Sequence, residues 1–299
     1  MPTTEVVLGS VPSEEALSRL LQRHQLYELV DPLIADPGFG DAQGWHECAC
    51  IPNPFFDHPR AQRLRLQPVK GSPPTIWEKL QAHRQPPLPK PDAPRPVCGW
   101  LIAQLPVASI ARYLNRQLLQ RKPSGRNALL RYYDPRVMLR LAAILSGPQL
   151  STLLGPVAHW LIMDHTGEMR VISPHGDSRR LNSLSLDDEQ WRAIERIGLV
   201  NRTLALCATL TDSQALDDEV VTDIDRLLAV AGSEGLEDPA ARMTFALHGL
   251  GRHAHFYRHS EVRRVLARCR EGENYQRLTA DWNHETWQRI AADTRESQI

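Results

Sequence analysis

Asn127-Ala-Leu-Leu-Arg-Tyr-Tyr-Asp-Pro-Arg-Val-Met-Leu-Arg-Leu-Ala-Ala-Ile-Leu145 changes from a strand pattern to a helix pattern in its middle. Residues 128–133 are mainly apolar and aromatic and follow a turn signal at residues 123–125, which predicts a short strand. Asp134 is a strong N-cap residue because its carboxylate can accept hydrogen bonds from free backbone N–H groups. Pro135 suits the first helical position. The stretch therefore predicts a strand, a capped corner and a helix.

The predicted helix from Val137 to Leu145 has Arg140 as its polar residue, so most of its surface is expected to be buried. Asp134 lies between Arg131 and Arg136, an arrangement that also suggests a general base. Two neighbouring cations would lower the pKa of that carboxyl and make it a poor base. The spacing favours a cap held by ionic neighbours, and we predict no catalytic residue here.

Composition bounds the class of protein. The chain has 299 residues, 42% of them hydrophobic, which suffices for one large domain or two lobes. Its zero net charge argues against a general nucleic-acid binder. Five cysteines without a dense framework predict free thiols in a reducing compartment. No signal-peptide pattern opens the sequence and no apolar run approaches the roughly 20 residues that span a bilayer. We expect a soluble cytoplasmic protein without a membrane partner.

Charge is unevenly distributed along the chain. Arg60–Arg140 contains 16 basic residues and three acidic ones, whereas Asp187–Asp238 contains 13 acidic residues and four arginines. Such regions either neutralise each other inside the protein or present charged faces to partners. The basic region leaves open a polyanion-binding function, which would be strongly salt-dependent.

Strand and helix patterns alternate in the first 183 residues. Apolar or alternating runs predict strands at 26–30, 45–51, 63–67 (as an edge strand), 97–104, 157–164 and 169–172. The last two flank the four-residue loop 165–168 and are predicted to form a β-hairpin. Helical spacing predicts helices at 13–24, 74–83 and 107–120, and a short helix that follows Gly147-Pro148 and ends at residue 154. Pro86–Pro96 has six prolines in eleven residues, which predicts a surface loop or a polyproline ligand for an aromatic groove.

Helical patterns continue from Ser185 to the last residues. Ser185 begins a weak capping box, Asp238-Pro239 repeats the cap device of Asp134-Pro135, and Ser260 is the predicted cap of an arginine-rich helix. We therefore predict an α+β protein: a mixed α/β lobe with a small sheet over residues 1–183, and a helical lobe over 184–299.

Two side-chain clusters suggest metal chemistry. His248, His253, His255 and His259 form the densest histidine group, and neutral imidazole is a common zinc ligand. The group lacks the HExxH pattern, so the simpler interpretation is a set of partly exposed histidines. A zinc-dependent enzyme or metal-binding protein remains an alternative. Cys48-Ala-Cys50, preceded by His46, is a weaker signal still. We predict no cofactor and no metal.

The segment Leu129-Leu-Arg-Tyr-Tyr-Asp-Pro-Arg-Val137 resembles the core motif of the type VI secretion effector chaperones or adaptors. These TEC or Tap proteins are defined by a domain long labelled as of unknown function. Supporting features are Tyr27–Asp31, Trp100–Ile102, and Gly155-Pro156 followed by Trp160. The similarity covers residues 26–165.

This resemblance implies a non-enzymatic bacterial protein that binds a cognate toxic effector and helps to load it onto a VgrG or PAAR spike protein. The motif residues Arg131, Tyr132, Tyr133, Asp134, Pro135 and Arg136 are expected to be mainly structural. A groove with an apolar floor, for instance between the lobes, or an exposed sheet edge would bind the effector. Trp77, Trp100, Trp191 and Trp287 are candidate anchors or, alternatively, core residues.

Overall fold

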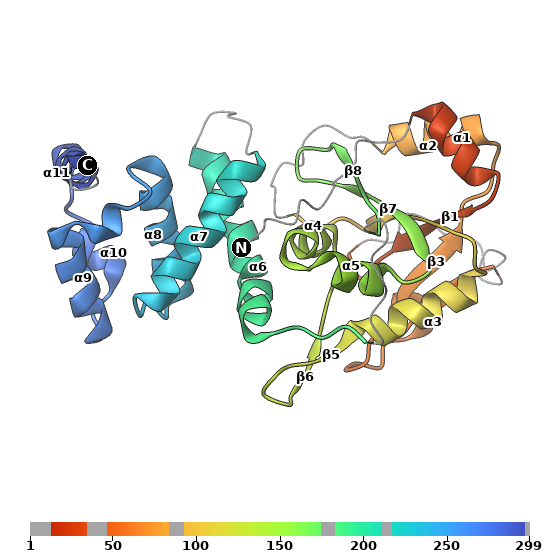
Figure 1. Ribbon diagram of the computed structural model, residues 1–299, viewed down its shortest axis with the longest axis horizontal. Coiled ribbons are helices and arrows are strands. Elements are labelled where there is room, and N and C mark those ends of the chain that lie inside the picture. Colours follow the sequence, from red (N-terminus) through yellow and green to blue (C-terminus); the bar gives the residue numbers. More distant parts are fainter. Residues whose placement is uncertain (1–12, 35–46, 84–92, 175–182, 211–216, 297–299) are drawn as a thin grey trace. The chain divides into compact units, whose positions relative to one another are not determined.

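The computed structural model describes residues 13–34, 47–83, 93–174, 183–210 and 217–296. The chain divides into two compact units, Met1–Ile194 and Glu195–Ile299. Within the described ranges the strands belong to the first unit and the second unit is helical, which confirms the predicted α+β fold class (Figure 1). No helix in these ranges is both long and apolar enough to cross a membrane.

The first unit is built on an antiparallel sheet of six strands in the order β2-β3-β1-β4-β7-β8. The strands are β1 (Gln25–Val30), β2 (Ala49–Ile51), β3 (Leu64–Pro68), β4 (Val97–Ala103), β7 (Val157–Met163) and β8 (Met169–Ile172). β1 lies between β3 and β4, so that Leu29 is opposite both Leu66 and Gly99. The hairpin predicted for β7 and β8 is confirmed.

Two helices cover one face of this sheet. α1 (Glu14–Leu21) and α2 (Pro73–Ala82) pack against each other, and their Leu17 and Leu80 join Trp100 of β4 in a buried cluster (Figure 1). Alternate side chains of a strand point to opposite faces. Leu101, the neighbour of Trp100 on β4, therefore points to the opposite face of the sheet, and it is fully buried there.

α3 (Val107–Leu118) packs against β2 and β3. Its Tyr113 lies against Gly155, the residue that ends α5 (Gly147–Leu154) with a φ of 57°. A Cβ atom at Gly155 would lie 2.0 Å from the Tyr113 ring, so this position requires glycine both for its backbone conformation and for its space.

A separate hairpin leads into the motif. β5 (Leu119–Arg121) and β6 (Asn127–Leu129) pair antiparallel, and the predicted turn joins them. The strand predicted for 128–133 was wrong beyond Leu129, because the chain turns there and the Asp134 N–H donates to the Arg131 carbonyl oxygen at 3.0 Å. That turn places Asp134 at the start of α4 (Pro135–Ile144), the predicted helix.

The predicted edge strand at 63–67 is an interior strand. β3 lies between β2 and β1, and residues 64–67 are all buried. Its alternating polar residues are enclosed, and Gln67 Nε2 donates to a Glu28 carboxylate oxygen at 2.6 Å. β2 is the true edge and is shorter than the predicted strand, part of which lies outside the described residues. Residues 86–92 of the proline-rich stretch also lie outside them.

The second unit is an assembly of helices around a core of aliphatic and aromatic side chains. Its helices are α7 (Asp218–Ser233), α8 (Pro239–Gly251), α9 (Ser260–Arg270), α10 (Tyr275–Thr279), α11 (His284–Glu296) and most of α6 (Asp188–Leu210). Asp238 caps α8 as predicted, accepting from the Ala241 N–H at 2.9 Å. The cap of α9 is His259, not the predicted Ser260.

α6 crosses from one unit to the other, since the division falls after Ile194, later than the predicted boundary near residue 183. Its first turn is tied to the first unit: Gln190 Nε2 donates to Gln149 Oε1 at 2.7 Å and to the Ile144 carbonyl oxygen at 3.2 Å. The cap at its start is Asp187, which accepts from the Gln190 N–H, rather than the predicted Ser185.

Candidate functional site

The corner between β6 and α4 is formed by Arg131-Tyr-Tyr-Asp-Pro-Arg136. The buried Asp134 Oδ1 accepts from the Arg136 backbone N–H at 3.0 Å and from its Nε at 2.9 Å. Oδ2 accepts from Arg136 Nη2 at 2.6 Å, and Arg131 Nη2 lies 3.6 Å from it. The predicted cap and its ionic neighbours are confirmed. Both carboxylate oxygens are occupied inside the protein.

The two motif tyrosines have different surroundings. Tyr132 is buried edge-on against Trp160 with 5.9 Å between ring centroids, and its hydroxyl donates to the Leu114 carbonyl oxygen at 2.7 Å. Tyr133 has the Arg131 guanidinium 5.6 Å from its ring centroid, and burial is the main cause that raises its pKa. Tyr132 thus locks the corner onto β7, whereas Tyr133 lines a pocket.

This pocket lies beside the corner within the first unit, and we call it the Asp31 pocket. It is small and has a mixed lining. The lining residues are Asp31, Leu33, Ile51, Asn53, His58, Gln62, Arg63, Leu64, Leu118, Leu129 and Tyr133. Four segments supply these side chains: the residues after β1, the stretch from the end of β2 to the start of β3, the end of α3, and the stretch from β6 into the corner. Segments distant in sequence therefore meet at one concave surface.

Asp31 is the most buried polar residue of the pocket lining, at 3% exposure. In the described part of the chain its carboxylate accepts one hydrogen bond, from the Leu33 N–H to Oδ1 at 3.1 Å. Burial raises the pKa of the Asp31 carboxyl, and the Leu33 hydrogen bond and the charge of Arg131 oppose that effect. A desolvated carboxylate with so little compensation is a candidate ligand-binding group.

Large apolar side chains are exposed near the pocket. Leu33 lines it and is 54% exposed, and the loop that contributes Asn53 and His58 also exposes Phe55 and Phe56 at 46% and 64%. The Asn53 side chain accepts from the Phe55 N–H at 2.9 Å, which shapes this loop. Clustered exposed apolar side chains are typical of protein-binding surfaces. The sequence patterns did not indicate these exposed residues, which follow Pro52-Asn-Pro54 at the end of β2.

The four tryptophans predicted as anchors or core residues differ in burial. Trp100, Trp191 and Trp287 are 3%, 5% and 4% exposed, as core residues are. Trp77 is half-buried against the cluster beneath α1 and α2. Partner binding through Trp77 stays a prediction, and the other three have little surface to offer without rearrangement.

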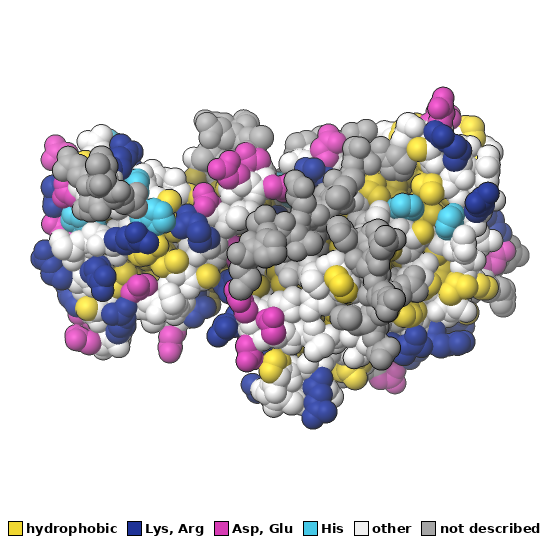
Figure 2. Space-filling view, viewed as in Figure 1, with side chains coloured by type: hydrophobic (Ala, Val, Ile, Leu, Met, Phe, Trp, Pro, Cys, Tyr) yellow, Lys and Arg dark blue, Asp and Glu magenta, His cyan; other side chains and the backbone are white. Residues whose placement is uncertain are grey.

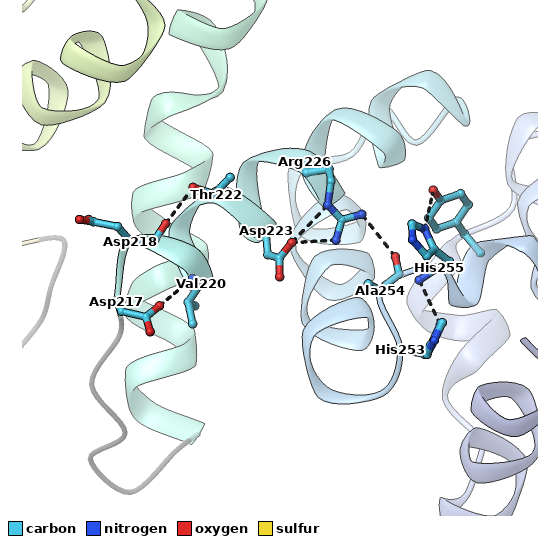
Figure 3. A network of polar contacts seen from close by, with 10 residues as sticks. Asp217, Asp218, Val220, Thr222, Asp223, Arg226, His253, Ala254 and His255 are labelled. Atoms are coloured by element: carbon cyan, nitrogen blue, oxygen red, sulfur yellow. Dashed lines mark hydrogen bonds and ion pairs between the residues drawn. The ribbon is translucent and has the colours of Figure 1, made fainter. Parts of the chain in front are cut away.

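The histidines from 248 to 259 do not share a common point in the hydrogen-bond network. His248 is half-buried in the core, where its Nδ1 lies 3.0 Å from the Tyr275 hydroxyl and burial lowers its pKa to about 4. His253 Nδ1 accepts from the His255 N–H, next to the Arg226 contact with the Ala254 carbonyl oxygen (Figure 3). His259 caps α9.

In the described ranges, no group of three or more His, Cys, Asp or Glu side chains is placed to hold a metal ion. Cys50 Sγ donates weakly to the Arg60 carbonyl oxygen at 3.9 Å. Burial is the main cause that raises the pKa of the Cys48 thiol, and a raised pKa makes this thiol a weak nucleophile. His46 lies outside the described residues.

Some of the charged residues form ion pairs with local partners. In the basic region, Arg63 pairs with Asp57 at 2.9 Å and Lys70 with Glu47 at 2.6 Å. In the helical unit, Arg196 pairs with Asp225 at 2.8 Å, and basic and acidic side chains are interspersed over the face drawn in Figure 2. These pairs reduce the charge available for a polyanion.

Comparison with known proteins gives one match. The family model described as "Domain of unknown function (DUF4123)" matches residues 70–152, which include α2, α3, α4, most of α5 and the complete corner. No curated protein and no solved structure gives a significant match to the chain.

Proposed function

We propose that this chain is a non-enzymatic chaperone or adaptor that binds a type VI secretion effector in the producing cell. It then helps to load the effector onto a VgrG or PAAR spike protein. The observation that carries the proposal is the DUF4123 match over residues 70–152, since that family is associated with type VI secretion chaperones. The match contains the Arg131–Arg136 motif that carries the resemblance to the effector chaperones.

The surface of the first unit supports binding of a protein chain. A chaperone covers apolar segments reversibly, so it needs apolar side chains that stay exposed in the free state. Leu33, Phe55 and Phe56 meet that requirement around the Asp31 pocket. Polar groups at its lining, such as Asn53 and His58, supply the hydrogen bonds that give a bound segment its register.

The state of the motif aspartate supports a role without turnover. A general base needs a free lone pair directed at a substrate, and the oxygens of Asp134 are engaged by Arg136. The five cysteines are free thiols, which agrees with action in a reducing cytoplasm before secretion.

Co-expression with the products of adjacent genes tests the proposal. The wild-type chain is expected to hold an effector or spike protein through size-exclusion chromatography. Phe56→Ser is expected to weaken that complex by about tenfold or more, because it removes an exposed aromatic anchor. Leu210→Ser is the matched control: Leu210, at 70% exposure, is a comparably exposed apolar residue on α6 of the helical unit.

Two results would contradict the proposal. One is that no adjacent gene product remains bound to the wild-type chain. The other is one equivalent of zinc in the purified protein together with an activity that His253→Ala abolishes, which would favour the metalloenzyme alternative.

A further inference from the structure

The carboxylate of Asp31 is the least compensated buried charge in the described part of the chain that faces a pocket. It accepts the Leu33 N–H hydrogen bond and makes no ion pair there. The other buried aspartates of this unit, Asp134 and Asp164, each have an arginine side chain within 2.8 Å. A charge removed from water without such a partner is costly unless a ligand completes its surroundings.

The cations nearest to the pocket are engaged elsewhere. Arg63 donates through Nη2 to Asp57 at 2.9 Å and through Nε to the His58 carbonyl oxygen at 2.8 Å. Arg131 lies over Tyr133 and beside Asp134. Arg131 and His58 lower the pKa of the Asp31 carboxyl by their charges, but neither forms an ion pair with it in the described part of the chain, and burial still dominates its pKa, which is raised. The pocket can therefore accept another positive charge.

We propose that the Asp31 pocket receives one lysine or arginine side chain of the bound protein. The apolar walls formed by Leu33, Leu118 and Leu129 suit the methylene groups of such a side chain, whose charged end reaches the Asp31 carboxylate. A charge-assisted hydrogen bond in this buried position is stronger than one from a neutral donor. The inference rests on the proposed function and names the residue class that the effector segment must present.

Calorimetric titration of the full-length chain with the purified product of the adjacent gene tests this assignment. Asp31→Asn is expected to weaken binding at least about 30-fold, as loss of one member of a buried charge pair does. Asp57→Asn removes the same charge from a 95% exposed side chain in the neighbouring loop, and is expected to change affinity less than about threefold.

A double-mutant cycle identifies the partner residue. Each lysine and arginine of the bound protein is replaced by methionine in turn. One replacement is expected to weaken binding to the wild-type chain about 30-fold and to have little further effect on binding to Asp31→Asn. Thermal unfolding of Asp31→Asn controls for folding, since asparagine can still accept the Leu33 N–H.

A second pair of variants tests the pocket without touching Asp31. Leu33→Lys puts a cation at the pocket wall, where it competes with the partner, whereas Leu33→Met has similar length without charge. The lysine variant is expected to bind at least about tenfold more weakly than the methionine variant.

The outcomes separate the two proposals. If the wild-type chain binds no adjacent gene product, the proposed function is overturned and this inference with it. If the wild-type chain binds, but Asp31→Asn binds equally well or no basic residue of the partner couples to Asp31, the pocket assignment alone is overturned. Equal binding by the two Leu33 variants would overturn it as well.

Discussion

The motif corner and the Asp31 pocket are neighbours, and each contains a buried aspartate in a different state. Asp134 in the corner accepts three hydrogen bonds from Arg136 alone, counting its backbone N–H, Nε and Nη2. Asp31 in the pocket accepts one, from the Leu33 N–H. The Asp134 carboxylate therefore has its hydrogen-bond donors within the chain. Burial of the Asp31 carboxylate, in contrast, is unfavourable and is not offset by an ion pair among the described residues. The residues that define a family motif and those that bind need not be the same.

Asp134→Ala is expected to give the largest loss of stability among these aspartate substitutions. Loss of the cap and of the partner of Arg136 should lower the free energy of unfolding by about 2 kcal/mol. Asp238→Ala removes the Asp-Pro cap of α8, whose carboxylate forms no ion pair with an arginine among the described residues, and should cost about 1 kcal/mol. Urea denaturation of both variants measures the difference, and equal losses would show that the arginine contributes nothing.

Asp164→Ala should cost about 1–2 kcal/mol at pH 7. Asp164 accepts from the Thr166 and Glu168 N–H groups and from Arg170 Nε at 2.8 Å. Burial alone would raise its pKa, but the hydrogen bonds from Thr166 and Arg170 lower it overall. A lowered folded-state pKa means that this stabilisation is present above the unfolded-state pKa and is lost as the pH falls through the folded-state value. The gap between variant and wild type should therefore narrow below about pH 4. A gap that is constant from pH 7 to pH 3 would contradict this.

Asp31→Asn is expected to raise the free energy of unfolding at neutral pH, by less than the preceding substitutions lower it. Because burial raises the folded-state pKa of Asp31, the folded state binds its proton more tightly, and ionisation above that pKa destabilises the fold. The asparagine variant should be more stable than the wild type at neutral pH by about 0.5–1 kcal/mol. The advantage should disappear as the pH falls below the ordinary aspartate pKa of about 3.9. Denaturation at pH 7 and pH 3.5 tests this, and a less stable variant at pH 7 would remove the argument that the pocket lacks a charge partner.

Asp57→Asn is expected to change the free energy of unfolding least among these substitutions. The Asp57 side chain is 95% exposed, and its contact with Arg63 is open to water and salt. Its unfolding transition should coincide with that of the wild type within experimental error. A clear shift would show that the loop carrying Phe55 and Phe56 is more tightly coupled to the fold than its exposure indicates.

The elements that local rules govern were predictable from the sequence. Asp134-Pro135 and Asp238-Pro239 start helices because the cap and the proline act within one turn. The β7–β8 hairpin followed from its apolar runs and short loop. Such signals depend on neighbouring residues alone.

The wrong predictions concern burial, long-range contacts and the choice between neighbouring residues as helix caps. β3 alternates like an edge strand, yet its Arg65 and Gln67 are enclosed between β2 and β1. His259 replaces Ser260 as a cap because its ring nitrogen reaches the Glu261 N–H, a geometry that a serine preference does not anticipate. The Asp31 pocket joins four separated segments, so no local pattern could reveal it.

Comparing Asp31→Asn and Asp134→Asn for both stability and partner affinity tests the central claim most directly. We expect Asp31→Asn to be folded, at least as stable as the wild type at pH 7, and about 30-fold weaker in binding the adjacent gene product. We expect Asp134→Asn to be less stable but to bind with unchanged affinity once the folded fraction is taken into account. An Asp134→Asn protein with wild-type stability and lost binding, beside an Asp31→Asn protein with full affinity, would place the binding site at the corner and contradict the account.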